Sequence, residues 1–358
     1  MIVTILGALF RCWVLIHRIM RVSHVLTPWL NMGTVTTTSS QALQYSPSIT
    51  PRGRYAPSPS GDLHVGNLRT ALLAWLCARI AGGSFVMRVE DLDRVQAGAA
   101  ERQFADLKAV GLDWDEEVLY QSSRGEGYKQ VIASLQEQGL TYECFCTRKE
   151  IQSATSAPHA APGAYPGTCR DLTQEERERR RQERPPAIRL RAERTQYTVV
   201  DELHGTFTGD VDDFVLLRND GTPAYNLAVV VDDHFQGVTQ VVRGDDLLPS
   251  APRQAYLANL LGYEAPRYVH VPLVLNREGK RLAKRDGAVT LGQLHDFGVS
   301  TGNLLELISS SIPLIKIVDP TTGVRRFPRT AQEMLAVFER EMMDLQPWVI
   351  DENVLKGA

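Results

Sequence analysis

The sequence has little of what would place it outside ordinary globular proteins. It has 5 cysteines in 358 residues, too few for the disulfide framework of a small secreted protein. The net charge is −3, so the chain is no polycation, and nucleic acid would have to meet a local basic patch. No Gly-x-Gly-x-x-Gly motif follows a predicted strand, which argues against a dinucleotide-dependent oxidoreductase. A chain of this length can still bury a real core in one or two domains.

Long hydrophobic runs are missing as well. The apolar N-terminal stretch is interrupted by Arg11 and Arg18, whereas a bilayer-spanning helix needs about 20 apolar residues. A charged leading region and a clear cleavage site are also missing. We expect residues 1–50 to be an extension that is disordered or reflects a misassigned start, with Met20 or Met32 as alternatives. A membrane anchor is the other interpretation; we expect a cytoplasmic chain without a membrane partner.

Strand and helix patterns alternate from about residue 52, which predicts an α/β fold. The predicted strands are Gly53–Ala56, Ser84–Val89, Ala228–Asp232 and Val238–Val242. The predicted helices are Leu68–Ile80, Glu101–Val110 and Ala251–Leu260. The last 70 or so residues should be mostly helical.

Residues 141–195 break this alternation and are predicted to be an insertion. They hold loops rich in Cys, Gly, Pro and Ala, followed by the charged run Arg177–Arg184. That run is a candidate contact for nucleic acid. A solvated surface helix explains it at least as well.

A His-x-Gly-x segment begins the first predicted helix. Backbone N–H groups at a helix start point at bound anions, and Gly66 lets a nucleotide approach the backbone closely. His64 can donate a hydrogen bond to a phosphate oxygen, and Asn67 can cap the helix. The motif alone is weak, because a histidine at this position is more often a structural cap.

A second segment, Lys280–Arg285, places several cations on a flexible loop. Adenylation needs positive charge where the α-phosphorus becomes five-coordinate and pyrophosphate leaves, and Lys284 is the best candidate to supply it. Solubility would explain a basic loop in isolation. The two segments together indicate an ATP site that makes an aminoacyl adenylate.

Both segments resemble the signature motifs of class I aminoacyl-tRNA synthetases. His64-Val65-Gly66-Asn67 is similar to HIGH, and Arg281-Leu282-Ala283-Lys284-Arg285 is similar to KMSKS. Asn67 replaces the second histidine of HIGH and Ala283 the serine of KMSKS, which weakens single hydrogen bonds. The chain resembles the glutamyl branch over roughly residues 52–290, through the segments Gly53–Asn67, Arg88–Asp93, Ala224–Asp233 and Val241–Leu247.

The resemblance implies a Rossmann-like catalytic core with an inserted zinc-binding subdomain and a short helical C-terminal region. The implied parts are core halves at 51–140 and 196–250, the insertion at 141–195, and a stem-contact region at 251–358 that carries the KMSKS-like loop but no anticodon-binding domain. ATP with Mg²⁺ is the implied substrate, with His64 and Lys284 catalytic. The implied ATP-binding residues are His64, Gly66, Asn67, Arg281, Leu282, Ala283, Lys284 and Arg285.

Four side chains suit the recognition of glutamate. Arg54 and Arg243 can each bind a carboxylate bidentately, and Tyr225 can donate to the same group. Glu90 can accept from the ammonium group. The resemblance places these four around the bound amino acid, with Ser58 near its α-amino end. Arg243 also follows a predicted apolar strand, where sites of α/β proteins form.

Cys144, Cys146 and Cys169 lie together in the insertion, as zinc ligands do. Three thiolates need a fourth donor. The residues alone favour His159, whereas the resemblance implies Tyr165 from the spacing Tyr165-x-x-x-Cys169. We expect one structural zinc ion per chain; three unbound thiols are the alternative.

About 70 residues follow the second motif, too few for the helical anticodon-binding region of a discriminating glutamyl-tRNA synthetase. The chain resembles the truncated glutamyl enzymes, which activate glutamate without tRNA and transfer it to queuosine in the anticodon of tRNA-Asp. This implies a queuosine-containing anticodon loop of tRNA-Asp as the RNA partner, and we expect a monomer. Two alternatives stay open: a short synthetase that charges tRNA-Glu, and an inactive relative that binds RNA or glutamate as a regulator.

Overall fold

The computed structural model describes residues 50–155, 165–281, 289–312, 316–319, 321–340, 343 and 345–350. Several predictions concern residues outside these ranges. They are the N-terminal extension, His159, and Leu282, Ala283, Lys284 and Arg285 of the basic loop.

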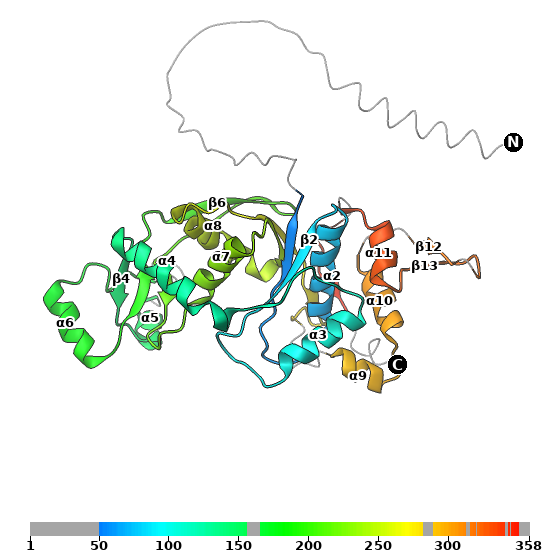
Figure 1. Ribbon diagram of the computed structural model, residues 1–358, viewed down its shortest axis with the longest axis horizontal. Helices are drawn as coiled ribbons and strands as arrows, with labels where there is room; N and C mark the ends of the chain where they lie inside the picture. The colour runs from blue at the N-terminus through cyan, green and yellow to red at the C-terminus, as the bar shows by residue number, and fades with distance from the viewer. Residues whose placement is uncertain are drawn as a thin grey trace, which may run out of the picture. The chain divides into compact units, whose positions relative to one another are not determined.

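A seven-stranded sheet lies at the centre of the described chain (Figure 1). Its order is β3-β2-β1-β9-β10-β6-β7, and every neighbouring pair is parallel except β6 and β7. The strands are β1 (Arg52–Tyr55), β2 (Ser84–Val89), β3 (Leu119–Tyr120), β6 (Gln196–Asp201), β7 (Gly205–Asp210), β9 (Gln240–Gly244) and β10 (Arg267–Val271). The strand order reverses between β1 and β9. In such sheets a crevice opens at the carboxyl ends of the strands at this point. The α/β, Rossmann-like prediction is confirmed.

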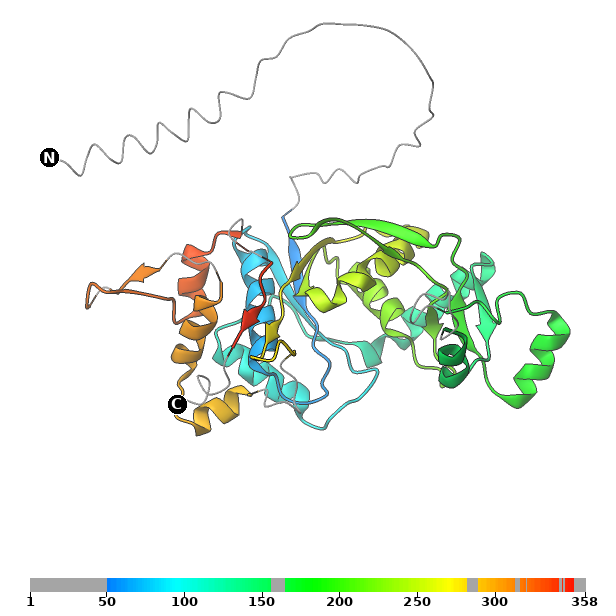
Figure 2. The same cartoon turned by 180° about the vertical axis from the view of Figure 1, so that it is seen from behind.

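Helices cover the sheet and extend beyond it on both sides (Figures 1 and 2). The helices are α2 (Val65–Arg79), α3 (Ala99–Ala109), α4 (Gly125–Glu137), α5 (Arg148–Thr155), α6 (Gln174–Glu183), α7 (Tyr225–Phe235), α8 (Ala251–Leu260), α9 (Leu291–Asp296), α10 (Thr301–Ser310) and α11 (Ala331–Val337), with 3₁₀ turns η1 (Gln121–Arg124) and η2 (Asp245–Ser250). Within the described ranges, none of them has both the length and the apolar character needed to cross a bilayer.

Helix α2 packs against β1 and β9 and forms the centre of the largest core cluster. Its Leu68, Leu72 and Leu76 are fully buried, as their spacing predicted. The chain leaves the helix at Gly83, where a Cβ would lie 2.1 Å from the carbonyl oxygen of Pro51. Only glycine permits this approach, so the predicted stop is also a packing requirement.

The predicted strand Ala228–Asp232 is wrong, because the segment is the middle of helix α7. This helix is enclosed by α4 and α8, and its residues from Leu227 to Asp233 are all buried. Burial on all sides removes the polar face that would reveal a helical period. A short apolar run rich in valine is then as compatible with a strand as with a helix.

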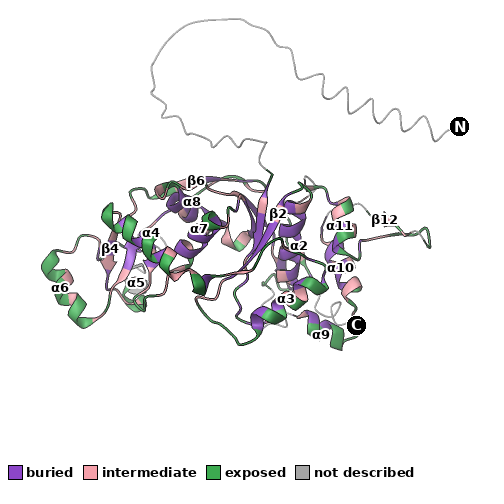
Figure 3. Cartoon of the chain, in the orientation of Figure 1, coloured by how far each residue is buried: buried purple, intermediate pink, exposed green. Residues whose placement is uncertain are grey.

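The segment after α4 forms a small antiparallel sheet with the order β4-β5-β8. Its strands are β4 (Thr141–Cys144), β5 (Ala187–Leu190) and β8 (Val215–Leu217). Helix α6, which contains most of the charged run, has no buried residue, as a solvated helix would (Figure 3).

The described residues of the C-terminal part form the helices α9, α10 and α11 and several short strands. Helix α11 packs beside α2 (Figure 2). The strands are β11 (Val274–Leu275), which pairs with β14 (Trp348–Val349), and the hairpin of β12 (Ile317–Val318) and β13 (Arg325–Arg326). The mostly helical prediction therefore holds for α9 to α11 but missed these short pairs.

Candidate active site

A cavity of about 660 Å³ opens at the carboxyl ends of β1 and β9, where the strand order reverses. It brings together nine of the predicted site residues, which come from β1, the β1–α2 loop, α2, the residue after β2, α7, β9 and the start of the basic loop. These residues are Arg54, Ser58, His64, Gly66, Asn67, Glu90, Tyr225, Arg243 and Arg281.

The N-cap of α2 is His64 and not Asn67, for which the capping role was predicted. The Asn67 backbone N–H donates to His64 Nδ1 at 3.3 Å, and the Asn67 side-chain oxygen accepts from the His64 backbone N–H at 3.2 Å. This reciprocal capping box uses Nδ1 as an acceptor, so the ring proton of neutral His64 lies on Nε2. Nε2 is therefore the atom with which His64 can donate.

Gly66 has a second role that its position in the motif did not reveal. A Cβ at Gly66 would lie 3.1 Å from both Cε1 and Nδ1 of His64. A side chain here would press on the imidazole ring. The glycine therefore leaves room for the His64 ring as well as leaving the backbone open to a nucleotide.

Arg54 extends from β1 into a buried network of charges. Its Nε lies 3.4 Å from Asp233 Oδ1, while Arg88 Nη1 donates to the same oxygen at 2.8 Å. Burial raises the pKa of Asp233, but the Arg88 and Arg54 charges outweigh it and hold that pKa below the usual range. Because Arg88 makes the shorter contact, it is the main partner of Asp233. Asp233 therefore compensates the charge of Arg54 only in part, and Arg54 can still attract an anionic ligand.

Glu90 follows β2 directly and lies at the same cavity. Arg88 Nη2 contacts its Oε1 at 3.4 Å. Burial raises the pKa of Glu90, against the effects of Arg88 and Arg54. With both carboxylates ionised, the guanidinium groups of Arg54, Arg88 and Arg243 exceed the carboxylates of Glu90 and Asp233 by one positive charge. Such a site suits glutamate, whose two carboxylates exceed its one ammonium group.

Arg243 lies in β9 on the other side of the crevice and is 5 % exposed. Its Nε donates to His270 Nε2 at 3.0 Å, and its Nη1 donates to Gln254 Oε1 at 2.8 Å. A longer contact of 3.4 Å joins Nη2 to the carbonyl oxygen of Leu247. Each of these three acceptors is neutral.

The remaining predicted residues lie at the rim. Tyr225 begins α7 and is 43 % exposed, and the carbonyl of Ser58 accepts from Gln103 Nε2 at 3.1 Å. Arg281 forms an ion pair with Asp246. Tyr225 and Ser58 also line a second, adjoining cavity.

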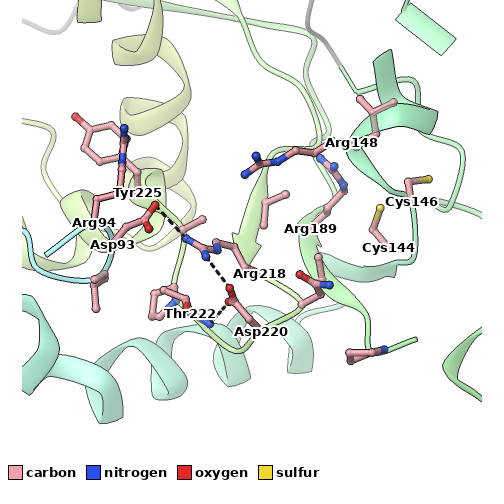
Figure 4. Close-up of a pocket in the computed structure, with 18 of the residues that line it drawn as sticks. Asp93, Arg94, Cys144, Cys146, Arg148, Arg189, Arg218, Asp220, Thr222 and Tyr225 are labelled. Carbon is pink, nitrogen blue, oxygen red and sulfur yellow. Dashed lines mark hydrogen bonds and ion pairs between the residues drawn. The ribbon is translucent and has the colours of Figure 1, made fainter. Parts of the chain in front are cut away.

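This second cavity, of about 820 Å³, lies between the first cavity and the cysteine cluster (Figure 4). Arg218 in its wall is neutralised by Asp93 at 3.3 Å and by Asp220 at 2.6 Å. Other basic side chains line it without a carboxylate at ion-pair distance among the described residues. They are Arg94, Arg148, Arg184 and Arg189.

The three predicted cysteine ligands converge. The Sγ atoms of Cys144, Cys146 and Cys169 lie within 4.8 Å of one another. The hydroxyl of Tyr165 lies 3.3 Å from Cys144 Sγ and 3.5 Å from Cys146 Sγ, and it accepts from the Cys169 backbone N–H at 3.0 Å. These cysteines could hold a metal ion.

Residues that hold Arg54 and Arg243 in place were missed by sequence reasoning, namely Arg88, Asp233, His270, Asp201 and Gln254. A signal was present for some of them. Asp233 ends an apolar run, and His270 interrupts an apolar strand, so each is a polar residue in a segment that is otherwise buried.

A largely parallel sheet with a reversal of strand order, a histidine that caps the start of α2 and a charged cavity beside them fit the catalytic domain of a class I aminoacyl-tRNA synthetase. The family described as tRNA synthetases class I (E and Q), catalytic domain, matches residues 51–356. The chain belongs to this family, as a ligase of the aminoacyl-tRNA synthetase type within the Glutamyl-Q tRNA(Asp) synthetase group.

Relatives and a solved structure support this assignment. A Glutamyl-Q tRNA(Asp) synthetase from Nocardia farcinica is 60% identical over 311 residues, which cover 87% of this chain and 96% of the relative. A second, from Cutibacterium acnes, is 48% identical over 320 residues, which cover 88% of this chain and 90% of that relative. A glutamate tRNA ligase from Elizabethkingia meningosepticum, solved with its amino acid, superposes with a TM-score of 0.66 at 26% identity, covering 86% of this chain and 68% of that one.

Proposed function

We propose that this chain activates glutamate with ATP in the absence of tRNA and transfers it to queuosine in the anticodon of tRNA-Asp, in the cytoplasm. The observation that carries the proposal is the first cavity, which Arg54, Arg243 and Glu90 line beside His64, the N-cap of α2. The names of the two relatives supply the modified base and the tRNA.

In the first step, Arg54 and Arg243 bind the carboxylate groups of glutamate, and Tyr225 donates to one of them. Glu90 accepts from the ammonium group, with Ser58 close to it. The α-carboxylate oxygen attacks the α-phosphorus of Mg-ATP, the bond from this phosphorus to the bridging oxygen breaks, and pyrophosphate leaves.

The charge that develops in this step is stabilised by two groups. His64 donates from Nε2, in the tautomer that the capping box imposes. Gly66, Asn67, Arg281, Leu282, Ala283 and Arg285 complete the proposed ATP site. Lys284, the second catalytic residue, lies outside the described residues and stays a prediction.

In the second step, a queuosine hydroxyl attacks the carbonyl carbon of the adenylate, and AMP leaves. The second cavity is where we place the RNA, because it adjoins the glutamate site at Ser58, Glu90 and Tyr225 (Figure 4). Arginines without carboxylate partners attract phosphate, and a loop with splayed bases can enter such a cavity.

The proposal is tested by supplying labelled glutamate and ATP with purified tRNAs that contain or lack queuosine. We expect glutamate-dependent ATP–pyrophosphate exchange without any RNA, and label only on queuosine-containing tRNA-Asp. Label on tRNA-Glu would identify a short glutamyl-tRNA synthetase. Binding of glutamate or RNA without exchange would identify an inactive regulator.

We further propose one structural zinc ion at Cys144, Cys146, Cys169 and Tyr165. A tetrahedral site with Zn–S bonds of about 2.3 Å places its sulfur atoms about 3.8 Å apart. The Sγ atoms of Cys146 and Cys169 lie 3.5 Å apart, and the Tyr165 hydroxyl lies at comparable distances from two of the thiols. The donor set fits zinc, which would tie β4 to the Tyr165–Cys169 loop.

Changing Cys144 to serine should remove the bound zinc and lower the melting temperature, because the metal joins segments that share only a small core of their own. Elemental analysis should give about one zinc per wild-type chain and much less for the variant. Cys77, which is buried in α2 away from the cluster, provides the control, and Cys77→Ser should keep its zinc. A metal-free wild type would contradict the proposal.

A further inference from the structure

Arg243 is a buried cation whose hydrogen bonds all go to neutral acceptors, unlike Arg54 and Arg88, which contact Asp233. A buried charge is costly unless an opposite charge compensates it. The three hydrogen bonds of Arg243 use three of its five N–H groups, so both Nη atoms retain a donor. Since Arg243 lines the first cavity, its charge is available to an anionic ligand there.

The Nε–H of Arg243 donates to His270, which is the middle member of a buried hydrogen-bonded series, Arg243–His270–Asp201, called the relay below. His270 pairs with Arg243 in the register of β10 and β9, which puts both side chains on one face of the sheet. On its other side, His270 Nδ1 lies 2.7 Å from Asp201 Oδ2. His270 is 0 % exposed and Asp201 is 1 % exposed.

The partners of His270 determine its tautomer. Arg243 can only donate, so Nε2 of His270 must carry the lone pair. The Asp201 carboxylate accepts, so the proton lies on Nδ1. Asp201 itself is fixed by the backbone N–H groups of Leu203, His204 and His270, at 2.9, 2.9 and 3.0 Å.

We infer that His270 is a positioning residue for Arg243: Asp201 holds it as the neutral Nδ1–H tautomer, and its Nε2 aims the guanidinium group at the carboxylate of glutamate. This inference rests on the proposed role of Arg243 in binding glutamate. An imidazole between Asp201 and Arg243 orients the cation while it keeps the carboxylate one ring away. A carboxylate in direct contact would orient Arg243 but also neutralise it.

The relay also predicts a dependence on pH. Burial, the largest influence, lowers the pKa of His270, Asp201 raises it in part, and Arg243 and His204 lower it, with a net pKa below the ordinary 6.5. Asp245 on η2 lies near His204 and adds a further titratable group to this region. His270 is therefore neutral at neutral pH. Acidification adds a proton on Nε2, which turns the acceptor of Arg243 into a donor and places two cations side by side.

Two substitutions of His270 separate positioning from packing. His270→Asn keeps a donor for Asp201 at the place of Nδ1 but removes the acceptor for Arg243. His270→Gln keeps an acceptor at the place of Nε2. In glutamate-dependent ATP–pyrophosphate exchange near pH 8, we expect His270→Asn to raise the KM for glutamate roughly 10- to 100-fold, the range for a lost hydrogen bond to a charged group. The KM for ATP should stay within about 3-fold, and His270→Gln should stay close to wild type.

His204→Asn is the matched control, because His204 Nε2 contacts the carbonyl oxygen of His270 without touching Arg243. It should change stability but not the KM for glutamate. As the pH falls, the KM for glutamate should rise more in wild type than in His270→Gln. Equal KM values for His270→Asn and His204→Asn would overturn the inference, and so would equal increases in His270→Asn and His270→Gln.

A measurement without turnover keeps this inference separate from the proposed function. Nitrogen-15 NMR of labelled histidine in the wild-type protein should show His270 as the Nδ1–H tautomer at neutral pH; the Nε2–H tautomer would overturn the relay. A wild type that shows the Nδ1–H tautomer but no glutamate-dependent exchange would support the relay and refute the proposed function.

Discussion

Arg54→Gln lowers kcat/KM for glutamate in ATP–pyrophosphate exchange by at least about 100-fold, the range for removing one partner of a buried charge pair. The substitution removes one of the two guanidinium groups, those of Arg54 and Arg243, that are proposed to bind glutamate in the cavity. The entering glutamate then meets the Glu90 carboxylate with only Arg243 left of the two arginines proposed to bind it. The KM for ATP should stay within about 3-fold, because Arg54 is proposed to touch only the amino acid.

Arg52→Gln is the matched control for this experiment. Arg52 lies on the same strand, but it pairs with Glu116 at 2.7 Å outside the cavity. It should leave the KM for glutamate within a few-fold of wild type. Arg54→Lys restores the charge without the planar fork, so its activity should lie between those of wild type and Arg54→Gln. Unchanged glutamate kinetics in Arg54→Gln would place the amino acid elsewhere.

Much of the fold around this site follows from local sequence signals. The apolar spacing of α2, the glycines that end it and the apolar strand β2 each specify their own element, so they could be predicted without knowledge of the rest. Helix α7 could not, because its neighbours bury it on every side. The predicted ligands Arg54 and Arg243 meet because β1 and β9 are adjacent in the sheet, which the α/β pattern alone does not specify.

The side-chain contacts that position the site residues could not be predicted from the sequence for a different reason. Arg88 and Asp233 are 145 residues apart, and Asp201 and His270 are 69 apart. No spacing rule connects such pairs, since the chain passes through several elements between them. A polar residue in an apolar, buried segment does, however, indicate that it has a hydrogen-bond partner. Asp233 and His270 could therefore have been identified as paired residues, although their partners could not.

His64→Ala should lower the rate of glutamate-dependent ATP–pyrophosphate exchange by about 100- to 1000-fold, the effect of removing one donor to charge that develops in a transition state. The same change also removes the N-cap of α2, which costs about 1 kcal/mol of stability. The two effects are separable, because asparagine is a strong N-cap but cannot place a donor where His64 Nε2 lies.

His64→Asn should therefore keep the melting temperature close to that of wild type while it loses nearly as much exchange activity as His64→Ala. The KM for glutamate should change little in either variant, since the glutamate-binding guanidinium groups lie on β1 and β9. An active His64→Asn with an inactive, destabilised His64→Ala would instead show that the histidine serves the helix alone. The charge of the departing pyrophosphate would then depend on the basic loop and on the N–H groups at the start of α2.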